Sequence, residues 1–466
     1  MGFLSIDIIG PLRLATVCVG FASLLSLWLI ITTIVAWYRL RHIPGPFFAS
    51  LSHLWVAKRI FFNTLKKDFT GLAKYGTLVR IAPNYVVTSD PNVLRQIASA
   101  RSTYGKDEWY EMIKFDPEHE NMVTLLENHA HDQRKAKTIK GYNGRENADL
   151  EYAINKQIAH LIDVIRGKYL SGPENRARCV DFASLSRYFT LDVITRLAYG
   201  QAFGFLDADG DLYEYTTKID KALRINNLCQ EVPFLKRIIF SRPFHALFGP
   251  QPTDEKGIGK IVGLTHKIIG ERFRDANPPD DMMGSFIRHG MTEDECRSEA
   301  MLQILAGADT TAVAIRTTLM YIVATPRVYS RIKTLIKQGV ERNEVSTPIT
   351  YEEAQKLPYL KAIILEGIRM RSPSVYGHYK KTPPEGDTIN GIFIPGGTAV
   401  GHNSLAMARS EAIFGEDVEV FRPERFLECD EKTKAERAST IDIFWSRPVD
   451  MCREADCYDR ASQSLL

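Results

Sequence analysis

The chain has little excess charge of either sign. Its 59 lysine and arginine residues nearly balance 56 aspartate and glutamate residues, which leaves a formal net charge of +3 over 466 residues. A balance this even gives no electrostatic basis for binding nucleic acid. Cysteine is also scarce: the seven cysteines are scattered, and the neighbouring pair Cys452 and Cys457 matches no zinc motif. Sparse cysteines are typical of a reduced, cytosol-facing protein.

Glycine is missing from the C-terminal part of the chain. None occurs from Ile443 to Leu466, and the last residues are charged or small with no apolar repeat. A packed amphipathic helix would show such a repeat. We therefore expect residues 441–466 to form an aberrant tail.

Charged residues are absent from Leu14 to Tyr38, a run of 25 residues rich in leucine, isoleucine and valine. This run is long enough to span a bilayer. Arg39 and Arg41 follow it directly, which places the rest of the chain in the cytosol. A cleaved signal peptide is the alternative, but the run is long and no clear small-residue cleavage site follows. We expect residues 1–40 to be a single-pass anchor in the endoplasmic reticulum membrane.

The anchor is followed by Ile43-Pro44-Gly45-Pro46. Two prolines around a glycine make a stiff turn that cannot continue a helix. Residues 41–50 are therefore a boundary, either a proline hinge that orients the following domain or a simple linker.

Strand and helix patterns mix in the remainder of the chain. Residues 78–83 and 85–88 are typical of two short strands, and residues 388–398 of a hairpin with its turn near Asn390-Gly391. Residues 150–200 show the spacing of two amphipathic helices.

A long apolar helix is predicted from Glu293 to about Ala324, and its middle reads Ala306-Gly307-Ala308-Asp309-Thr310-Thr311. A glycine there costs roughly 1 kcal/mol against alanine. A buried Asp309 carries a desolvation penalty unless it is paired, and threonines can bond the carbonyl four residues earlier. Either these polar groups face something, or the helix is a kinked core helix whose polar groups are satisfied internally.

Two further motifs follow. Glu366 and Arg369 lie three residues apart on a helical pattern and can pair, although such pairs are common on surfaces. Phe421-Arg422-Pro423-Glu424-Arg425-Phe426 is an aromatic-bounded turn with two arginines.

The three motifs, in this order and at these distances, resemble the cytochrome P450 family of heme-thiolate monooxygenases from about residue 40 to about residue 440. The resemblance is greatest to fungal microsomal members of secondary metabolism, near the pisatin demethylase type. It implies that Asp309 and Thr310 are catalytic and handle protons, while Ala306 and Gly307 lie beside the heme. It further implies a structural network behind the heme that joins Glu366, Arg369 and Arg425.

The resemblance also implies donors for the two heme propionates. His131 and Lys135 match a helix that carries such donors in many members, and Lys380 matches a position that often holds arginine. Lysine is a weaker substitute there because it lacks the bidentate fork. A solvated helix face, usable for docking a reductase, is the alternative for the basic residues near His131. Residues 203–262, rich in phenylalanine, resemble the part that covers the substrate pocket and touches the membrane.

The resemblance stops at the axial ligand of the iron. The family carries a loop of the form Phe-x-x-Gly-x-x-x-Cys-x-Gly, whose thiolate promotes O–O cleavage. The corresponding stretch begins at Phe444 and has no glycine, and Met451 occupies the cysteine position. Cys452 is the candidate metal ligand, with an unstructured tail as the alternative. We expect the cysteine loop to be lost or frame-shifted, which leaves the domain C-terminally incomplete.

A shift of one nucleotide would restore the loop. Read one nucleotide forward, the codons of Trp445 and Ser446 force glycine, and those of Met451 and Cys452 force cysteine. The other codons permit Phe-Gly-x-Gly-Arg-Trp-Thr-Cys-Ala-Gly-Lys. Since only two residues are forced, chance remains the alternative.

Together these observations predict a mainly α-helical protein with small β-sheets: an anchor at 1–40, a hinge at 41–50, a cytochrome P450-like domain at 51–440 and a tail at 441–466. The implied activity is oxidation of an apolar small-molecule substrate with heme b, NADPH and O2, with electrons from a membrane-bound NADPH-cytochrome P450 reductase. The alternative is a membrane-anchored, catalytically inactive remnant that binds heme poorly or not at all. A purely structural helical protein is disfavoured by the three motifs together.

Overall fold

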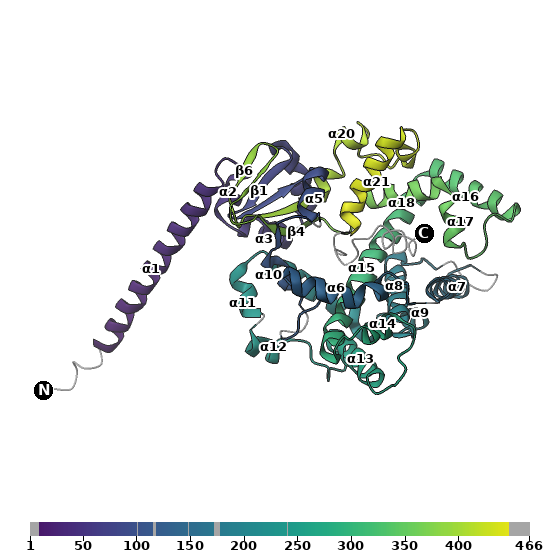
Figure 1. Ribbon diagram of the computed structural model, residues 1–466, viewed down its shortest axis with the longest axis horizontal. Coiled ribbons are helices and arrows are strands. Elements are labelled where there is room, and N and C mark those ends of the chain that lie inside the picture. The colour runs from purple at the N-terminus through teal and green to yellow at the C-terminus, as the bar shows by residue number, and fades with distance from the viewer. Residues whose placement is uncertain are drawn as a thin grey trace.

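The computed structural model describes residues 9–99, 101–114, 118–147, 149–171, 178–239 and 241–446. Helices dominate, two small sheets lie at one side, and one long helix, α1, projects away from the rest (Figure 1). The predicted class, mainly α with small β-sheets behind an N-terminal apolar helix, is confirmed.

The N-terminal elements surround the larger sheet. They are α1 (Ile9–Arg39), α2 (Phe47–Leu51), α3 (Leu54–Phe61), α4 (Leu65–Thr70), η1 (Gly71–Tyr75), β1 (Leu78–Ala82), β2 (Tyr85–Thr88), α5 (Pro91–Ala98), β3 (Gly105–Lys106) and η2 (Glu108–Ile113). The central part is helical: α6 (Asn128–Tyr142), α7 (Leu150–Lys168), α8 (Phe182–Tyr199), α9 (Phe205–Ala208), η3 (Leu212–Glu214), α10 (Tyr215–Gln230), α11 (Pro233–Ile239), α12 (Arg242–Phe248), α13 (Gly257–Arg272) and α14 (Met282–Arg288).

The C-terminal part begins with the longest helix, α15, and returns to the sheet. Its elements are α15 (Glu293–Ala324), α16 (Pro326–Glu341), α17 (Tyr351–Gln355), α18 (Pro358–Met370), β4 (Tyr376–Lys381), β5 (Asp387–Ile389), β6 (Ile392–Ile394), β7 (Ala399–Asn403), α19 (Ser404–Met407), α20 (Glu411–Phe414), η4 (Pro423–Phe426) and α21 (Glu431–Ser446).

The larger sheet has the strand order β1-β2-β7-β4-β3, so its neighbouring strands β2 and β7 come from opposite ends of the chain. β2 and β7 pair in parallel, and the other pairs are antiparallel. The smaller sheet is the predicted hairpin of β5 and β6, in which Asp387 pairs with Ile394. Its turn residues Asn390 and Gly391 have φ of +49° and +78°, the left-handed region that an Asn-Gly turn favours.

The predicted anchor forms α1. Its segment Val19–Arg39 has a mean hydropathy of 2.2 and none of it is buried. In the part of the chain that the structure describes, this is the one helix long and apolar enough to cross a membrane. Packing within the chain therefore gives no reason for its apolar surface.

The predicted central helix forms α15. It begins with a capping box, in which the Thr292 hydroxyl accepts from the Glu295 amide and the Glu295 carboxylate accepts from the Thr292 amide. From there α15 passes between the helical layer that contains α8 and the sheet side of the molecule (Figure 1). Every functional residue predicted on this helix is therefore held at the centre of the fold.

Candidate functional site

The middle of α15 has both buried and half-buried residues. Ala308, Ala312 and Ala314 are buried, whereas Ala306, Thr310 and Val313 are only half-buried. The spacing of three to four residues puts these three in one stripe along the helix. The predicted residues Ala306 and Thr310 therefore lie on one side of α15.

Thr310 lies on this stripe and bonds back to its own helix. Its hydroxyl donates to the Ala306 carbonyl oxygen at 2.7 Å. This is the back-bond that the sequence indicated for threonines in this helix. The hydroxyl is thus oriented beside the half-buried stripe.

Asp309 points to a different side, because successive helical residues are about 100° apart. Its carboxylate accepts from Arg187 of α8, at 2.7 Å from Nε and 3.2 Å from Nη2. Arg187 also pairs with Asp220 of α10 at 2.9 Å. One guanidinium therefore connects α8, α10 and α15.

The protonation of Asp309 is balanced between two effects. Burial raises the pKa of Asp309 above its ordinary value, while the charge and hydrogen bonds of Arg187 work in the opposite direction. The side chain keeps 27% of its exposure, so it is not sealed from solvent. Burial is the larger of the two effects, so the pKa of Asp309 lies above its ordinary value.

Arg187 was missed by the sequence reasoning. It lies on one of the two predicted amphipathic helices of residues 150–200, where an arginine every few residues is ordinary. The only signal was the acid in the middle of a buried helix, which requires a partner from elsewhere. The identity of that partner depends on how α8 packs on α15.

Gly307 serves the packing of α8 on α15. A Cβ at this position would lie 2.8 Å from Cδ1 of Ile194, which is closer than real Cβ atoms come. Ala306, one residue earlier, packs instead against the cluster that includes the sheet residues. The two residues expected beside the heme thus face different neighbours, and Ala306 is the one on the stripe with Thr310.

A second charged cluster is fully buried behind α18. The Glu366 carboxylate accepts from Arg369 Nε at 2.7 Å and from Arg425 Nε at 3.0 Å. The remaining nitrogens of the two arginines donate mostly to carbonyls, for example from Arg369 to Ala408 and Val418 at 2.9 and 2.7 Å. All three side chains have 0% exposure. The structure therefore brings Glu366, Arg369 and Arg425 together.

The expected propionate donors come from two elements. His131 and Lys135 lie one turn apart on α6, and Lys380 lies on β4 opposite Val400 of β7. The His131 ring has 13% of its exposure and Nδ1 is 3.3 Å from Asp132. Lys135 and Lys380 are half-buried. The side chains are suitable in charge and burial for carboxylate groups.

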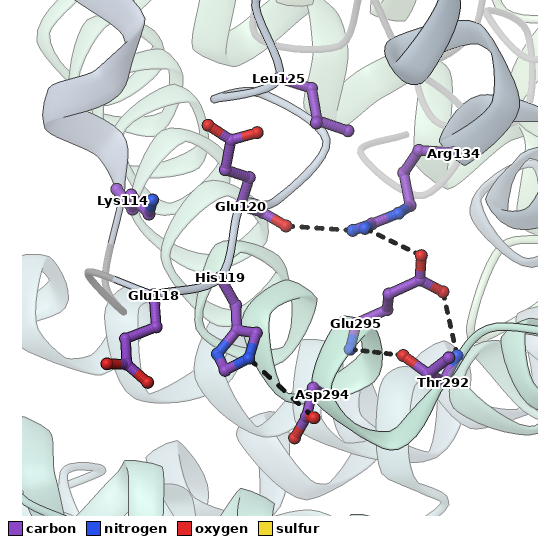
Figure 2. A pocket seen from close by; sticks show the side chains of 9 residues that line it. All are labelled: Lys114, Glu118, His119, Glu120, Leu125, Arg134, Thr292, Asp294 and Glu295. Carbon is purple, nitrogen blue, oxygen red and sulfur yellow. Dashed lines mark hydrogen bonds and ion pairs between the residues drawn. The ribbon is translucent and has the colours of Figure 1, made fainter.

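Arg134, next to these residues, is used elsewhere. It pairs with Glu299 at 3.2 Å. It also pairs with Glu295 at 3.1 Å and donates to the Glu120 carbonyl, as Figure 2 shows. The hollow shown there, of about 470 Å³, is lined by mostly charged side chains. Glu295 precedes Asp309 by 14 residues, which is roughly 21 Å along a helix. This hollow is therefore separate from the stripe at Ala306 and Thr310.

The predicted iron ligand Cys452 lies outside the described residues. Four cysteines outside α1, Cys179, Cys229, Cys296 and Cys429, are free thiols in the described part of the chain. The same ranges contain no cluster of three histidine, cysteine or acidic side chains that could hold a metal ion. The prediction of Cys452 as the iron ligand therefore rests on the sequence alone.

The comparisons with known proteins all find cytochrome P450 proteins. The family model described as Cytochrome P450 matches residues 42–440. The chain is 40% identical to the cytochrome P450 monooxygenase ABA1 of Pyricularia oryzae over 445 residues, which cover 93% of this chain and 86% of that protein. It is 40% identical to aba1 of Botryotinia fuckeliana over 419 residues, with 89% and 82% covered. It is 35% identical to abl1 of Leptosphaeria maculans over 445 residues, with 94% and 78% covered.

Proposed function

This chain belongs to the cytochrome P450 family of monooxygenases, and from that premise we propose that it oxidises an apolar small molecule in fungal secondary metabolism. The family uses heme iron, with O2 and with electrons from NADPH that arrive through a reductase. The observation that carries the proposal is the half-buried stripe of α15, with Thr310 on it and the paired Asp309 beside it. The finer resemblance to the pisatin demethylase type stays a prediction.

Two groups of described residues support a heme site. The half-buried stripe of Ala306, Thr310 and Val313 is proposed to lie against the heme, and His131, Lys135 and Lys380 would supply cationic or polar donors for two propionates. When bound, heme supplies an iron that activates O2 for insertion into the substrate. We propose that Glu366, Arg369 and Arg425, whose hydrogen bonds join α18 and η4, form the scaffold behind it.

Asp309 and Thr310 are proposed to move protons into this dry site. The Asp309 carboxyl, held by Arg187 of α8 and 27% exposed, would take up a proton from water. The Thr310 hydroxyl, oriented by the Ala306 carbonyl, presents a proton at the stripe. Because the two residues are adjacent on the helix, they connect the solvent side with the stripe.

Membrane attachment is part of the proposal. The apolar surface of α1 and the two arginines that follow it support a single-pass anchor in the endoplasmic reticulum membrane, with the catalytic domain cytosolic. NADPH-cytochrome P450 reductase in the same membrane is then the proposed electron donor. Alkaline carbonate extraction of microsomes tests the anchor, since release of the full-length chain would contradict it.

A second candidate function rests on one observation. No glycine occurs from Ile443 to Leu466, where the family carries its cysteine loop. A chain with this tail is a catalytically inactive remnant that binds heme poorly or not at all. The carbon monoxide difference spectrum of the reduced full-length protein separates the two functions: a thiolate-ligated heme band supports the monooxygenase, and its absence supports the remnant.

We further infer that the segment from about Phe444 is read out of frame. The forced glycine at Trp445/Ser446 and the forced cysteine at Met451/Cys452 support this. Sequencing of genomic DNA and transcript across codons 430–466 is expected to reveal a one-nucleotide change or a misplaced intron just before Phe444. A shifted frame without the glycine four residues before the cysteine, or with an early stop codon, would contradict the inference.

A further inference from the structure

The C-terminal end of α1 is capped by a side chain from the sheet. The last carbonyls of a helix have no partner within it. Here Arg80 of β1 donates from Nη2 to the Ala36 carbonyl at 2.8 Å and from Nη1 to the Trp37 carbonyl at 3.1 Å. A positive charge at this end also matches the helix dipole. The contact is long-range, since more than 40 residues separate Arg80 from either carbonyl.

The same guanidinium is also bound to its own strand and the turn after it. Arg80 donates to the carbonyls of Ala82 at 3.3 Å and Pro83 at 2.7 Å. The residue is 1% exposed. A planar group with five donors that binds four fixed carbonyls has one geometry, which a single ammonium could not reproduce.

Further contacts hold the segment that joins α1 to α2, residues 39–46, which we call the joint. Arg39 Nη2 donates to the Gly396 carbonyl at 2.7 Å, and His42 Nε2 lies 2.7 Å from the Phe393 carbonyl. These carbonyls belong to β6 and the segment just after it. Leu40 and Ile43 lie between and are 0% and 4% exposed, in the core that includes Leu78. The joint thus contacts both sheets.

The proline segment is packed rather than open. The Arg80 amide donates to the Pro44 carbonyl at 2.9 Å. A Cβ at Gly45 would overlap the Arg80 carbonyl oxygen, so only glycine allows this approach. The two prolines restrict the backbone on either side of Gly45. Bending between α1 and the sheet would break these contacts.

An apolar rim follows directly after the joint. Five large side chains on α2, α3 and the residue after α3 are between 61% and 73% exposed: Phe47, Phe48, Leu54, Phe61 and Phe62. Lys66 and Lys67 are exposed close behind them in the sequence. Figure 1 shows α2 at the base of α1, and α11 and α12 on the flank of the domain toward α1. Leu247 and Phe248 of α12 are also exposed, by 76% and 72%.

We propose that Arg80 locks α1 at one angle to the sheet, so that the phospholipid bilayer around α1 also covers the apolar rim of α2 and α3. The proposal rests on the anchor proposed for α1. The bilayer is chosen as the occupant because the rim continues the apolar surface of α1 within eight residues of Arg39. Exposed lysines near such a rim suit anionic headgroups. A large exposed apolar patch on an isolated domain otherwise has no cover.

The test measures the angle in the full-length protein. Nitroxide amino acids are introduced at Leu24 and Lys74, both exposed, and the protein is placed in nanodiscs of phosphatidylcholine and phosphatidylserine. Double electron–electron resonance is expected to give one narrow distance distribution for the otherwise native chain. Arg80→Gln is expected to widen it at least twofold. Arg59→Gln is the matched control, because Arg59 contacts Trp55 and Asp68 and no residue of α1.

Contact between the apolar rim and lipid is measured in the same nanodisc sample by photolabelling. A photoactivatable phosphatidylcholine is expected to label residues 47–62, and less so in Arg80→Gln than in Arg59→Gln. A broad distribution in the native chain, an unchanged width in Arg80→Gln, or a rim that is unlabelled and open to an aqueous quencher would each overturn the proposal. If Arg80→Gln fails to fold, Arg80→Lys takes its place, since it keeps the charge but not the fork. A native chain that does not enter nanodiscs contradicts the anchor itself, whereas an inserted chain with a broad distribution contradicts only the lock.

Discussion

Glu366 and Asp309 are both carboxylates paired with arginine, but their surroundings differ. Glu366 has 0% exposure and accepts hydrogen bonds from two arginines, which in turn are held by backbone carbonyls. Asp309 keeps 27% exposure and shares its single arginine with Asp220. A network with every donor and acceptor used is rigid, whereas a shared arginine leaves a carboxyl that can change its protonation. The first arrangement is suited to a scaffold and the second to a reaction.

A third buried carboxyl, that of Glu231, accepts hydrogen bonds from neutral side chains instead of arginine. Glu231, at the end of α10, is 4% exposed and accepts from Tyr376 at 2.8 Å and Trp109 at 3.3 Å. With no cation among these partners, burial raises the pKa of Glu231 to about 7. By contrast, hydrogen bonds from Arg422 and Arg425 overcome the opposing effect of burial and lower the pKa of Asp417 to about 2. Glu231 and Asp417 differ in burial and in arginine partners, and their pKa values move in opposite directions.

The largest effect is expected from Glu366→Gln. The amide leaves the buried Arg369 without its counter-charge and leaves Arg425 with Asp417 alone, and breaking such a buried pair costs about 3–5 kcal/mol. We expect a loss of this size in the free energy of unfolding, measured by denaturant titration. Glu419→Gln is the control, because Glu419 pairs with Arg409 while 70% exposed and should change stability by less than about 1 kcal/mol. Equal losses in the two variants would show that the buried network is not special.

Glu231→Gln is expected to change how stability depends on pH. The carboxyl has an ordinary pKa of 4.5, and its pKa in the folded protein is about 7. The folded chain therefore holds the proton more tightly between these values, and native stability falls as pH rises from about 4.5 to about 7. At 1.36 kcal/mol per pKa unit the fall is about 3 kcal/mol.

The amide cannot titrate, so Glu231→Gln should remove this fall in stability. Relative to the native chain, the stability of the variant should therefore increase as pH rises to about 7. Thermal unfolding at several pH values measures it. Glu108→Gln is the control, because Glu108 is exposed and its pKa lies below the ordinary value. A native chain whose stability is flat from pH 5 to 7 would refute the assignment.

Thr310→Ala is expected to separate oxygen consumption from product formation. The measurement uses a chain whose residues 444–452 are replaced by the glycine–cysteine loop typical of the family. Loss of the hydroxyl should lower product per NADPH consumed by about a hundredfold, at the low end of the effects of proton-transfer groups. Thr311→Ala is the matched control on the next position of α15. An unchanged product yield in Thr310→Ala would reduce the hydroxyl to a packing role.

The smallest change in the free energy of unfolding is expected for Asp309→Asn. Its sign should be opposite to that of Glu366→Gln. Burial raises the pKa of Asp309, so the ionised form at pH 7 is held at a cost. Native stability therefore falls as pH rises from the ordinary pKa of 3.8 to the folded value. Removing the charge should leave stability at pH 7 unchanged or raised by up to about 1 kcal/mol, while activity falls. A loss comparable to that of Glu366→Gln would place Asp309 among the structural pairs.

The sequence predicted local features correctly where a residue type is unusual in its surroundings or favours one conformation. A glycine, an acid and two threonines in an apolar helix indicated polar contacts, and Thr310 and Asp309 both have them. The apolar run at Leu14–Tyr38 indicated α1, and the Asn390-Gly391 pair indicated a hairpin turn. Each of these signals is local, because propensity, periodicity and turn chemistry act over a few residues. The roles of His131, Lys135, Lys380 and Cys452 toward heme stay predictions.

What the sequence by itself determined is the list of elements, the family and the residue types available for chemistry. Only the tertiary structure decided their partners: Arg187 for Asp309, Ile194 against Gly307, and Arg80 for the end of α1. These residues lie 122, 113 and 44 positions from the groups they contact, counted to Asp309, Gly307 and Ala36. No local pattern carries such a pairing, because it depends on how whole helices and strands pack. The physical reason is that a buried charge needs a partner but does not specify which one.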